Sequence, residues 1–106
     1  MIYEYRYYNI KEGMIADCHR VFQQTLIPLF NKLNIKTIAF WEPQDSDGRT
    51  FIYLLGFQDA VAREKAWADF ASSPEWKKTV ADLGDNAPWE STQSTVLVPT
   101  SYSPQP

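Results

Sequence analysis

The residues best placed to do chemistry lie near the start of the chain. Glu4 and Arg6 are two positions apart in a segment where tyrosines alternate with charged residues, so both share one face of a β-strand. The planar guanidinium of Arg6 can hold a carboxylate through two parallel hydrogen bonds. An ordinary Glu4–Arg6 ion pair without a ligand fits the same pattern, and that alternative stays open.

Two aromatic residues can complete a ligand site around this pair. Tyr8 continues the same strand face and offers a phenol hydroxyl, and Trp41 on a later strand offers a stacking surface. We therefore predict that a small, partly apolar acid is bound by Glu4, Arg6, Tyr8 and Trp41. Core packing is the alternative for both rings, because aromatic side chains in sheets commonly build cores.

His19 is the single histidine, and an imidazole is the side chain whose ordinary pKa lies near neutrality, so His19 is the candidate general base. It follows Cys18, which belongs to an apolar helical stripe, by one residue or about 100°. We therefore place His19 at the rim of the core, with no carboxylate partner fixed by sequence spacing. Cys18 is expected to be a buried, unreactive thiol.

Metal and cofactor motifs are absent from the sequence. One cysteine and one histidine cannot assemble a closed zinc site. The run from Asp45 to Gly48 begins like a calcium loop, but the twelfth position of that loop is Gly56 where calcium binding needs a glutamate. Glycine-rich phosphate loops are also missing. We expect no metal and no cofactor.

Composition limits the class of protein. A chain of 106 residues with 44% hydrophobic residues and a net charge of −3 has room for one folded domain, 1–106, in which we expect 99–106 to be a loosely held tail. No basic cluster suggests nucleic acid as a partner. The longest apolar run, 51–57, falls well short of the ~18 residues that span a bilayer, so we expect a cytoplasmic protein without a membrane span.

Hydrophobic periodicity predicts the elements that position these residues. Alternating or apolar runs predict strands over 2–9, 35–42, 50–58 and 91–98. Repeats of three or four predict helices over 15–33, 60–70 and 74–83, with a kink or restart at Pro28 and N-caps at Asp59 and Ser73. The βαββαβ order predicts an α+β, ferredoxin-like domain, in which helices cover one face of a four-stranded antiparallel sheet.

The third predicted strand is apolar on both faces, although the helices suffice to cover one. We expect the other face to bury against a second copy, giving a homodimer or a higher assembly of dimers. If Tyr3, Tyr5 and Tyr7 pack under the helices, then the opposite face of that strand looks into the dimer cleft. That face carries Glu4, Arg6 and Tyr8.

An ordered set of short motifs resembles the NIPSNAP family over nearly the whole chain, from Ile2 to Pro104. The motifs are Tyr3-Glu4-x-Arg6-x-Tyr8, Lys11-x-Gly13, Phe40-Trp41, Tyr53-Leu54, Arg63-Glu64, Pro74-Glu75-Trp76 and Pro99-Thr100-Ser101-Tyr102-Ser103-Pro104. The resemblance implies a dimeric α/β barrel, in which two ferredoxin-like sheets face each other. That architecture also hosts cofactor-independent monooxygenases, lactone isomerases and haem-degrading enzymes, whereas the NIPSNAP branch has no settled reaction.

Two functions remain open at this point. The first is binding of a small acid without chemistry, and the alternative is a cofactor-independent monooxygenase or isomerase. They differ in whether a base points into the cleft, because proton transfer needs a base within hydrogen-bond reach of the reacting proton. The candidate bases are His19, Glu4 and Glu42, and we favour binding.

Overall fold

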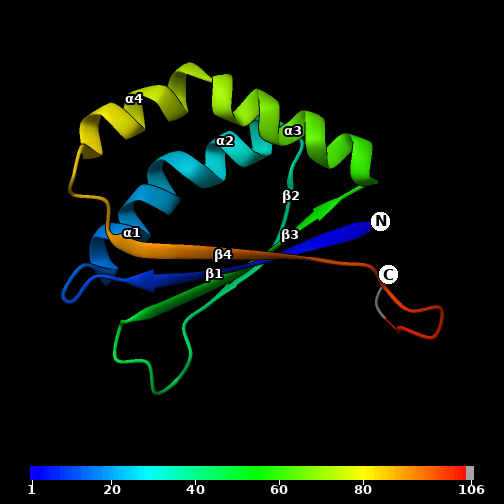
Figure 1. The fold of residues 1–106 in the computed structure, drawn as a ribbon, viewed down its shortest axis with the longest axis horizontal. Helices are drawn as coiled ribbons and strands as arrows, with labels where there is room; N and C mark the ends of the chain where they lie inside the picture. The colour runs from blue at the N-terminus through cyan, green and yellow to red at the C-terminus, as the bar shows by residue number, and fades with distance from the viewer. Residues whose placement is uncertain (105–106) are drawn as a thin grey trace.

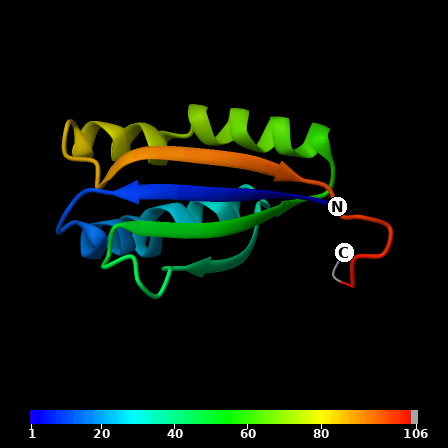
Figure 2. The same cartoon turned by 60° about the horizontal axis from the view of Figure 1, so that its bottom comes forward.

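The four strands form one antiparallel sheet in the order β2-β3-β1-β4, and all helices lie on one of its faces (Figures 1 and 2). This computed structural model describes residues 1–104. The arrangement confirms the predicted ferredoxin-like α+β fold. The elements in chain order are β1 (Ile2–Ile10), α1 (Ile15–Val21), η1 (Phe22–Leu26), α2 (Ile27–Lys32), β2 (Lys36–Trp41), β3 (Thr50–Phe57), α3 (Ala60–Ser72), α4 (Pro74–Leu83) and β4 (Trp89–Leu97).

The first helical segment changes its winding just before Pro28. The five residues of η1 form a π-helix, and α2 then restarts with Pro28 in its first turn. Proline has no N–H to donate and its ring crowds the preceding turn, and the wider π turn accommodates both effects. The predicted kink or restart at Pro28 is therefore confirmed.

Side-chain caps divide the second helical segment into α3 and α4. Asp59 accepts a hydrogen bond from the backbone N–H of Ala62 at 2.8 Å, and the hydroxyl of Ser73 accepts one from Trp76 at 3.2 Å. Each cap satisfies a backbone donor that the first helical turn leaves free. Both predicted N-caps are confirmed.

The core lies between the sheet and the helices. From β3, Phe51, Tyr53 and Leu55 are buried. The rings of Phe51 and Tyr53 meet Phe22 of η1, and that of Tyr53 also meets Phe30 of α2. Residues directly paired across antiparallel strands have side chains on the same face. Arg6 pairs with Tyr53, so the even-numbered face of β1 is the face that the helices cover.

The prediction that Glu4, Arg6 and Tyr8 face a dimer cleft is therefore wrong. These three residues lie under the helices, and Tyr3, Tyr5 and Tyr7 are on the helix-free face. The error came from the assumption that rings are buried in preference to charges. Here α3 brings hydrogen-bond donors onto Glu4, and a charge paired and hydrogen-bonded in this way can be buried.

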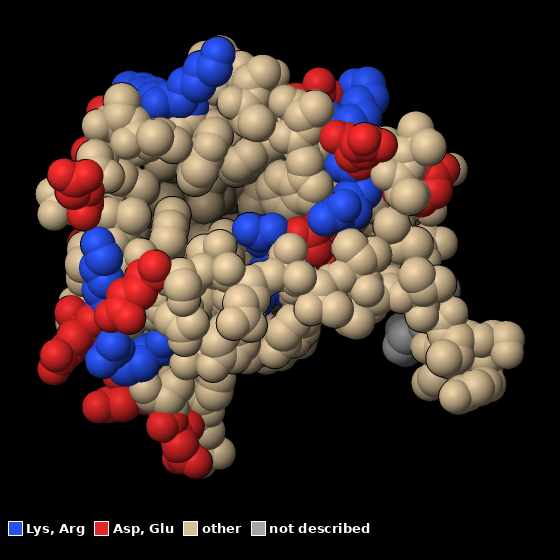
Figure 3. Space-filling view, in the orientation of Figure 1, with Lys and Arg blue, Asp and Glu red and all other residues tan. Residues whose placement is uncertain are grey.

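The helical layer leaves one side of the sheet open. No residue of α4 is buried, and every residue of β4 after Trp89 is exposed. In the space-filling view a hollow lies between α4 and β4, and acidic and basic side chains meet beside it (Figure 3). Helix α4 packs on η1 and α3. On the helix-covered face of β1, Glu4, Tyr8 and Ile10 are buried, and the side chain of Arg6 keeps 19% exposure.

Two further features concern the described residues as a group. Among residues 1–104, no helix combines the length and the apolar character needed to cross a bilayer. The same residues include no group of three or more His, Cys, Asp or Glu side chains arranged to hold a metal ion. The structure describes the predicted tail as far as residue 104, and 105–106 lie outside the described residues. In this segment the backbone N–H of Ser103 donates a hydrogen bond to the carbonyl oxygen of Thr100.

Candidate functional site

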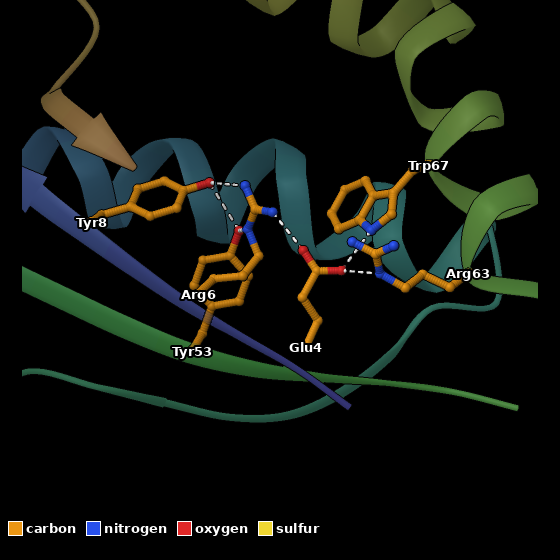
Figure 4. Close-up of polar contacts among 6 residues, drawn as sticks. All are labelled: Glu4, Arg6, Tyr8, Tyr53, Arg63 and Trp67. Carbon is orange, nitrogen blue, oxygen red and sulfur yellow. Dashed lines mark hydrogen bonds and ion pairs between the residues drawn. The ribbon is translucent and has the colours of Figure 1, made fainter. Parts of the chain in front are cut away.

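A connected group of polar and aromatic side chains lies between the sheet and α3 (Figure 4). We call it the Arg6 cluster. Strand β1 contributes three of its even-numbered residues, β3 contributes a tyrosine, and α3 contributes two residues one turn apart. Its members are Glu4, Arg6, Tyr8, Tyr53, Arg63 and Trp67.

Glu4 is the buried centre of the Arg6 cluster, with a side chain that is about 1% exposed. One carboxylate oxygen accepts from Nη1 of Arg6 at 2.7 Å. The other accepts from Nε of Arg63 at 2.7 Å and from the indole N–H of Trp67 at 2.8 Å. Burial alone raises the pKa of Glu4, but these hydrogen bonds outweigh it and hold the pKa below its usual value. Glu4 is therefore a carboxylate at neutral pH.

Arg6 lies against two phenol hydroxyls as well as Glu4. Its Nε donates to the hydroxyl of Tyr53 at 2.9 Å, and its Nη2 makes a long bond of 3.4 Å to that of Tyr8. The two hydroxyls are 2.9 Å apart. Burial, followed by the neighbouring Tyr8, raises the pKa of Tyr53 well above its usual value, so Tyr53 stays a neutral phenol. The guanidinium also lies over the ring of Trp67, at 5.1 Å from its centroid.

The Arg6 cluster carries one positive charge that it does not neutralise. Two guanidinium groups, Arg6 and Arg63, surround the single carboxylate of Glu4. A guanidinium has five N–H donors. Arg6 uses three of them and Arg63 uses one in hydrogen bonds to residues 1–104. Their side chains are 19% and 30% exposed, so the remaining donors are within reach of solvent or of a ligand.

The floor beside these donors is polar. Arg6 pairs across the sheet with Ser94 of β4, and Tyr8 pairs with Thr92, so both β4 hydroxyls lie on the face that carries the cluster. Both residues are exposed. Guanidinium donors therefore lie with hydroxyl groups beside them, an arrangement suited to a carboxylate.

The structure brings together three of the four predicted ligand-binding residues. Trp41 is separate, because it pairs with Ile52 and therefore lies on the helix-free face, 48% exposed. Sequence reasoning missed Tyr53, Arg63 and Trp67. The i, i+4 spacing of Arg63 and Trp67 was the signal that could have placed both on one helix face, whereas Tyr53 could be found only from the strand register.

The structure supplies a carboxylate partner for His19. Its Nε2 lies 2.8 Å from a carboxylate oxygen of Glu42, which follows the end of β2. His19 is half-buried, as its predicted place at the rim of the core requires. Cys18 is fully buried, and burial, with a smaller effect of Glu42, raises the pKa of its thiol to about 12. A thiolate is therefore rare at neutral pH, in keeping with the predicted unreactive thiol.

This combination of a four-stranded antiparallel sheet with helices on one face defines an α+β, ferredoxin-like domain. The NIPSNAP family model matches residues 3–104, and the chain belongs to the NIPSNAP family. No curated protein sequence matches the chain.

Several solved structures have the same fold. A NIPSNAP family protein from Agrobacterium tumefaciens is 20% identical, with 99% of this chain and 98% of that chain covered and a TM-score of 0.86. An uncharacterized NIPSNAP domain protein from Burkholderia xenovorans is 19% identical, with 98% and 99% covered and a TM-score of 0.83. An antibiotic biosynthesis monooxygenase is 14% identical, with 94% and 99% covered and a TM-score of 0.68. At these identities the likeness concerns the fold alone.

Proposed function

We propose that the protein binds a small, partly apolar organic acid at the Arg6 cluster, in the hollow between α4 and β4. The observation that carries the proposal is the imbalance of the cluster, in which two guanidinium groups surround one carboxylate. A partly desolvated cation without a full counter-charge is costly unless an anion pairs with it. A ligand carboxylate supplies that anion, and the positive charge disfavours a protonated amine.

The surroundings of the cluster favour an acid with an apolar body. Trp67 lies under the guanidinium of Arg6, and Trp76 of α4 packs against Phe70, so indole rings border this part of the molecule. Val80 of α4 is 49% exposed, although the spacing of α4 places it on the apolar side of the helix. Binding sites for small molecules combine apolar walls with a few placed polar groups, and the hollow has both.

The test compares phenylacetate with phenylacetamide by isothermal titration calorimetry. The two probes have the same ring, but phenylacetate carries a negative carboxylate and phenylacetamide a neutral amide. We expect phenylacetate to bind the wild-type protein and Arg6→Met to weaken that binding by about 1 to 3 kcal/mol, because a charge-assisted hydrogen bond is lost. Arg63→Met should weaken binding by a similar amount.

The matched control is Lys36→Met, which also removes one positive charge. Lys36 is exposed on β2, at the opposite edge of the sheet from β4. Lys36→Met should leave the affinity for phenylacetate unchanged. The proposal fails if phenylacetamide binds as tightly as phenylacetate, or if Arg6→Met and Lys36→Met have the same effect.

We also propose that two copies associate through the helix-free face of the sheet. Over β1, β2 and β3 this face is largely aromatic and aliphatic, and the helices leave it uncovered (Figure 2). Exposed apolar sheet faces of this kind commonly mark association surfaces. Strand β4 adds the polar residues Gln93 and Thr95 to this face. The aromatic and aliphatic side chains of the face include Tyr3, Tyr5, Tyr7, Trp41, Ile52, Leu54 and Leu97.

A cytoplasmic location fits the single cysteine, since reducing compartments keep thiols unpaired.

Sedimentation equilibrium at micromolar concentration tests the dimer. We expect the wild-type protein to sediment as a dimer and Leu54→Arg to sediment as a monomer, because Leu54 lies at the middle of the helix-free face, between Tyr5 and Ala39. Val61→Arg, which adds the same charge at an exposed position of α3, should stay dimeric. A monomeric wild-type protein would overturn this proposal.

A further inference from the structure

A second cavity lies at the β2 edge of the molecule. Its volume is about 250 Å³, and we call it the β2 cavity. Most of its wall is apolar, with rings and an aliphatic side chain from both layers, and polar groups are few. It is lined by His19, Phe22, Gln23, Ile27, Phe40, Trp41, Glu42 and Phe51.

The polar groups of the β2 cavity include an oriented base. Nε2 of His19 is 2.8 Å from Glu42, and the imidazole meets the ring of Phe51 edge-on at a centroid distance of 5.6 Å. A carboxylate on one imidazole nitrogen holds the proton there and leaves the other nitrogen with its lone pair. In residues 1–104 no group hydrogen-bonds to Nδ1 of His19, so this nitrogen is available to a ligand.

We propose that the β2 cavity binds a small neutral ring compound and that His19, positioned by Glu42, takes a proton from a carbon atom of that ligand. A cavity of roughly 150 Å³ accommodates benzene, so about 250 Å³ accommodates one substituted ring. The carboxylate of Glu42 at the wall disfavours an acid. The ligand class therefore differs from that of the Arg6 cluster.

The chemistry needs no second reactant. His19 takes the proton from a carbon beside a carbonyl group, and the electron pair of the broken C–H bond moves onto the carbonyl oxygen as an enolate. The imidazolium then returns the proton to that oxygen or to another carbon of the same molecule. The result is an isomerisation in which nothing is oxidised or reduced. Glu42 is a positioning residue, which stabilises the imidazolium without contacting the ligand.

The probe for this base is 5-nitrobenzisoxazole, a neutral ring compound that releases a coloured phenolate. The base takes the ring C–H proton, and the N–O bond breaks with its electron pair left on oxygen. We expect saturable turnover by the wild-type protein, faster than by free imidazole at equal concentration. His19→Gln should lower kcat by at least about 100-fold. Free imidazole should restore part of the rate of this variant.

Three further variants separate catalysis from structure. Glu42→Gln should lower kcat about 10-fold with KM unchanged, because the pair orients the base without contacting the ligand. Ile27→Trp should raise KM by filling the β2 cavity, with the His19–Glu42 pair left intact. Glu64→Gln, an exposed change on α3, should leave the rate at the wild-type value.

Circular dichroism establishes that each variant is folded, and His19 is exposed enough for the change to glutamine to be tolerated. Wild-type turnover in His19→Gln, or a wild-type rate that rises linearly with probe and matches free imidazole, overturns the proposal. An unchanged KM in Ile27→Trp also overturns it, because the reaction then occurs outside the β2 cavity.

Discussion

Replacing Glu4 by glutamine should lower the free energy of unfolding by about 3 kcal/mol at neutral pH. The isosteric change removes the charge that Arg6, Arg63 and Trp67 all contact, and it leaves the two guanidinium groups facing each other. Removing one partner of a buried ion pair costs about 3 to 5 kcal/mol. Because both arginines are partly exposed, we expect a loss at the lower end of this range. Urea unfolding followed by circular dichroism measures the change.

The pH dependence of the same variant provides a second check. The folded-state pKa of Glu4 lies below its usual value, so its contribution to stability is complete above the unfolded pKa and is lost as the pH falls through the folded pKa. The difference between wild type and Glu4→Gln should therefore shrink as the pH falls below about 4. Glu64→Gln is the control, and its effect should stay within about 0.5 kcal/mol at every pH. Equal stability of the wild type and Glu4→Gln at neutral pH would contradict this account of the cluster.

Phe22→Ala should lower the free energy of unfolding by about 3 to 5 kcal/mol, the usual cost of removing a buried phenylalanine ring. Phe22 is 2% exposed and contacts Tyr8 and Tyr53 of the Arg6 cluster as well as Phe40 and Phe51 of the β2 cavity. For a domain of this size each kcal/mol shifts the Tm by roughly 4 to 8 °C, so differential scanning calorimetry should show a loss of more than about 10 °C.

Val61→Ala is the control for that experiment. Val61 is 76% exposed on α3, so its change to alanine should shift the free energy of unfolding by at most about 0.5 kcal/mol.

Because Phe22 contacts residues of both sites, Phe22→Ala should also weaken phenylacetate binding and slow turnover of the benzisoxazole probe. A Phe22→Ala protein that keeps the wild-type Tm would show that η1 is packed differently from the arrangement described.

The sequence contained enough information for the fold, because each element has a local cause. The caps at Asp59 and Ser73 and the proline at position 28 act within a few residues of their own positions. The alternation of β1 likewise predicts a strand with two distinct faces. Which face the helices cover is a tertiary property, since a charged pair can be buried once other elements supply donors.

Which residues meet in the two sites depends on contacts between residues far apart in the sequence. Glu4 and Trp67 are 63 residues apart, and His19 and Glu42 are 23 residues apart. No local spacing brings such residues together. The helices cover the face of β1 that the sequence analysis had assigned to the dimer cleft, so the predicted acid site lies on the helix-covered side. Glu4, Arg6 and Tyr8 still form one group, as predicted. Their shared parity is a property of the strand alone.

The most direct test of acid binding is a crystal structure of the protein with 4-bromophenylacetate, whose bromine is located by its anomalous signal. We predict a bromine peak between α4 and β4, with the carboxylate within hydrogen-bond distance of Arg6 or Arg63. A bromine peak on the helix-free face, or no peak at saturating probe, would contradict it.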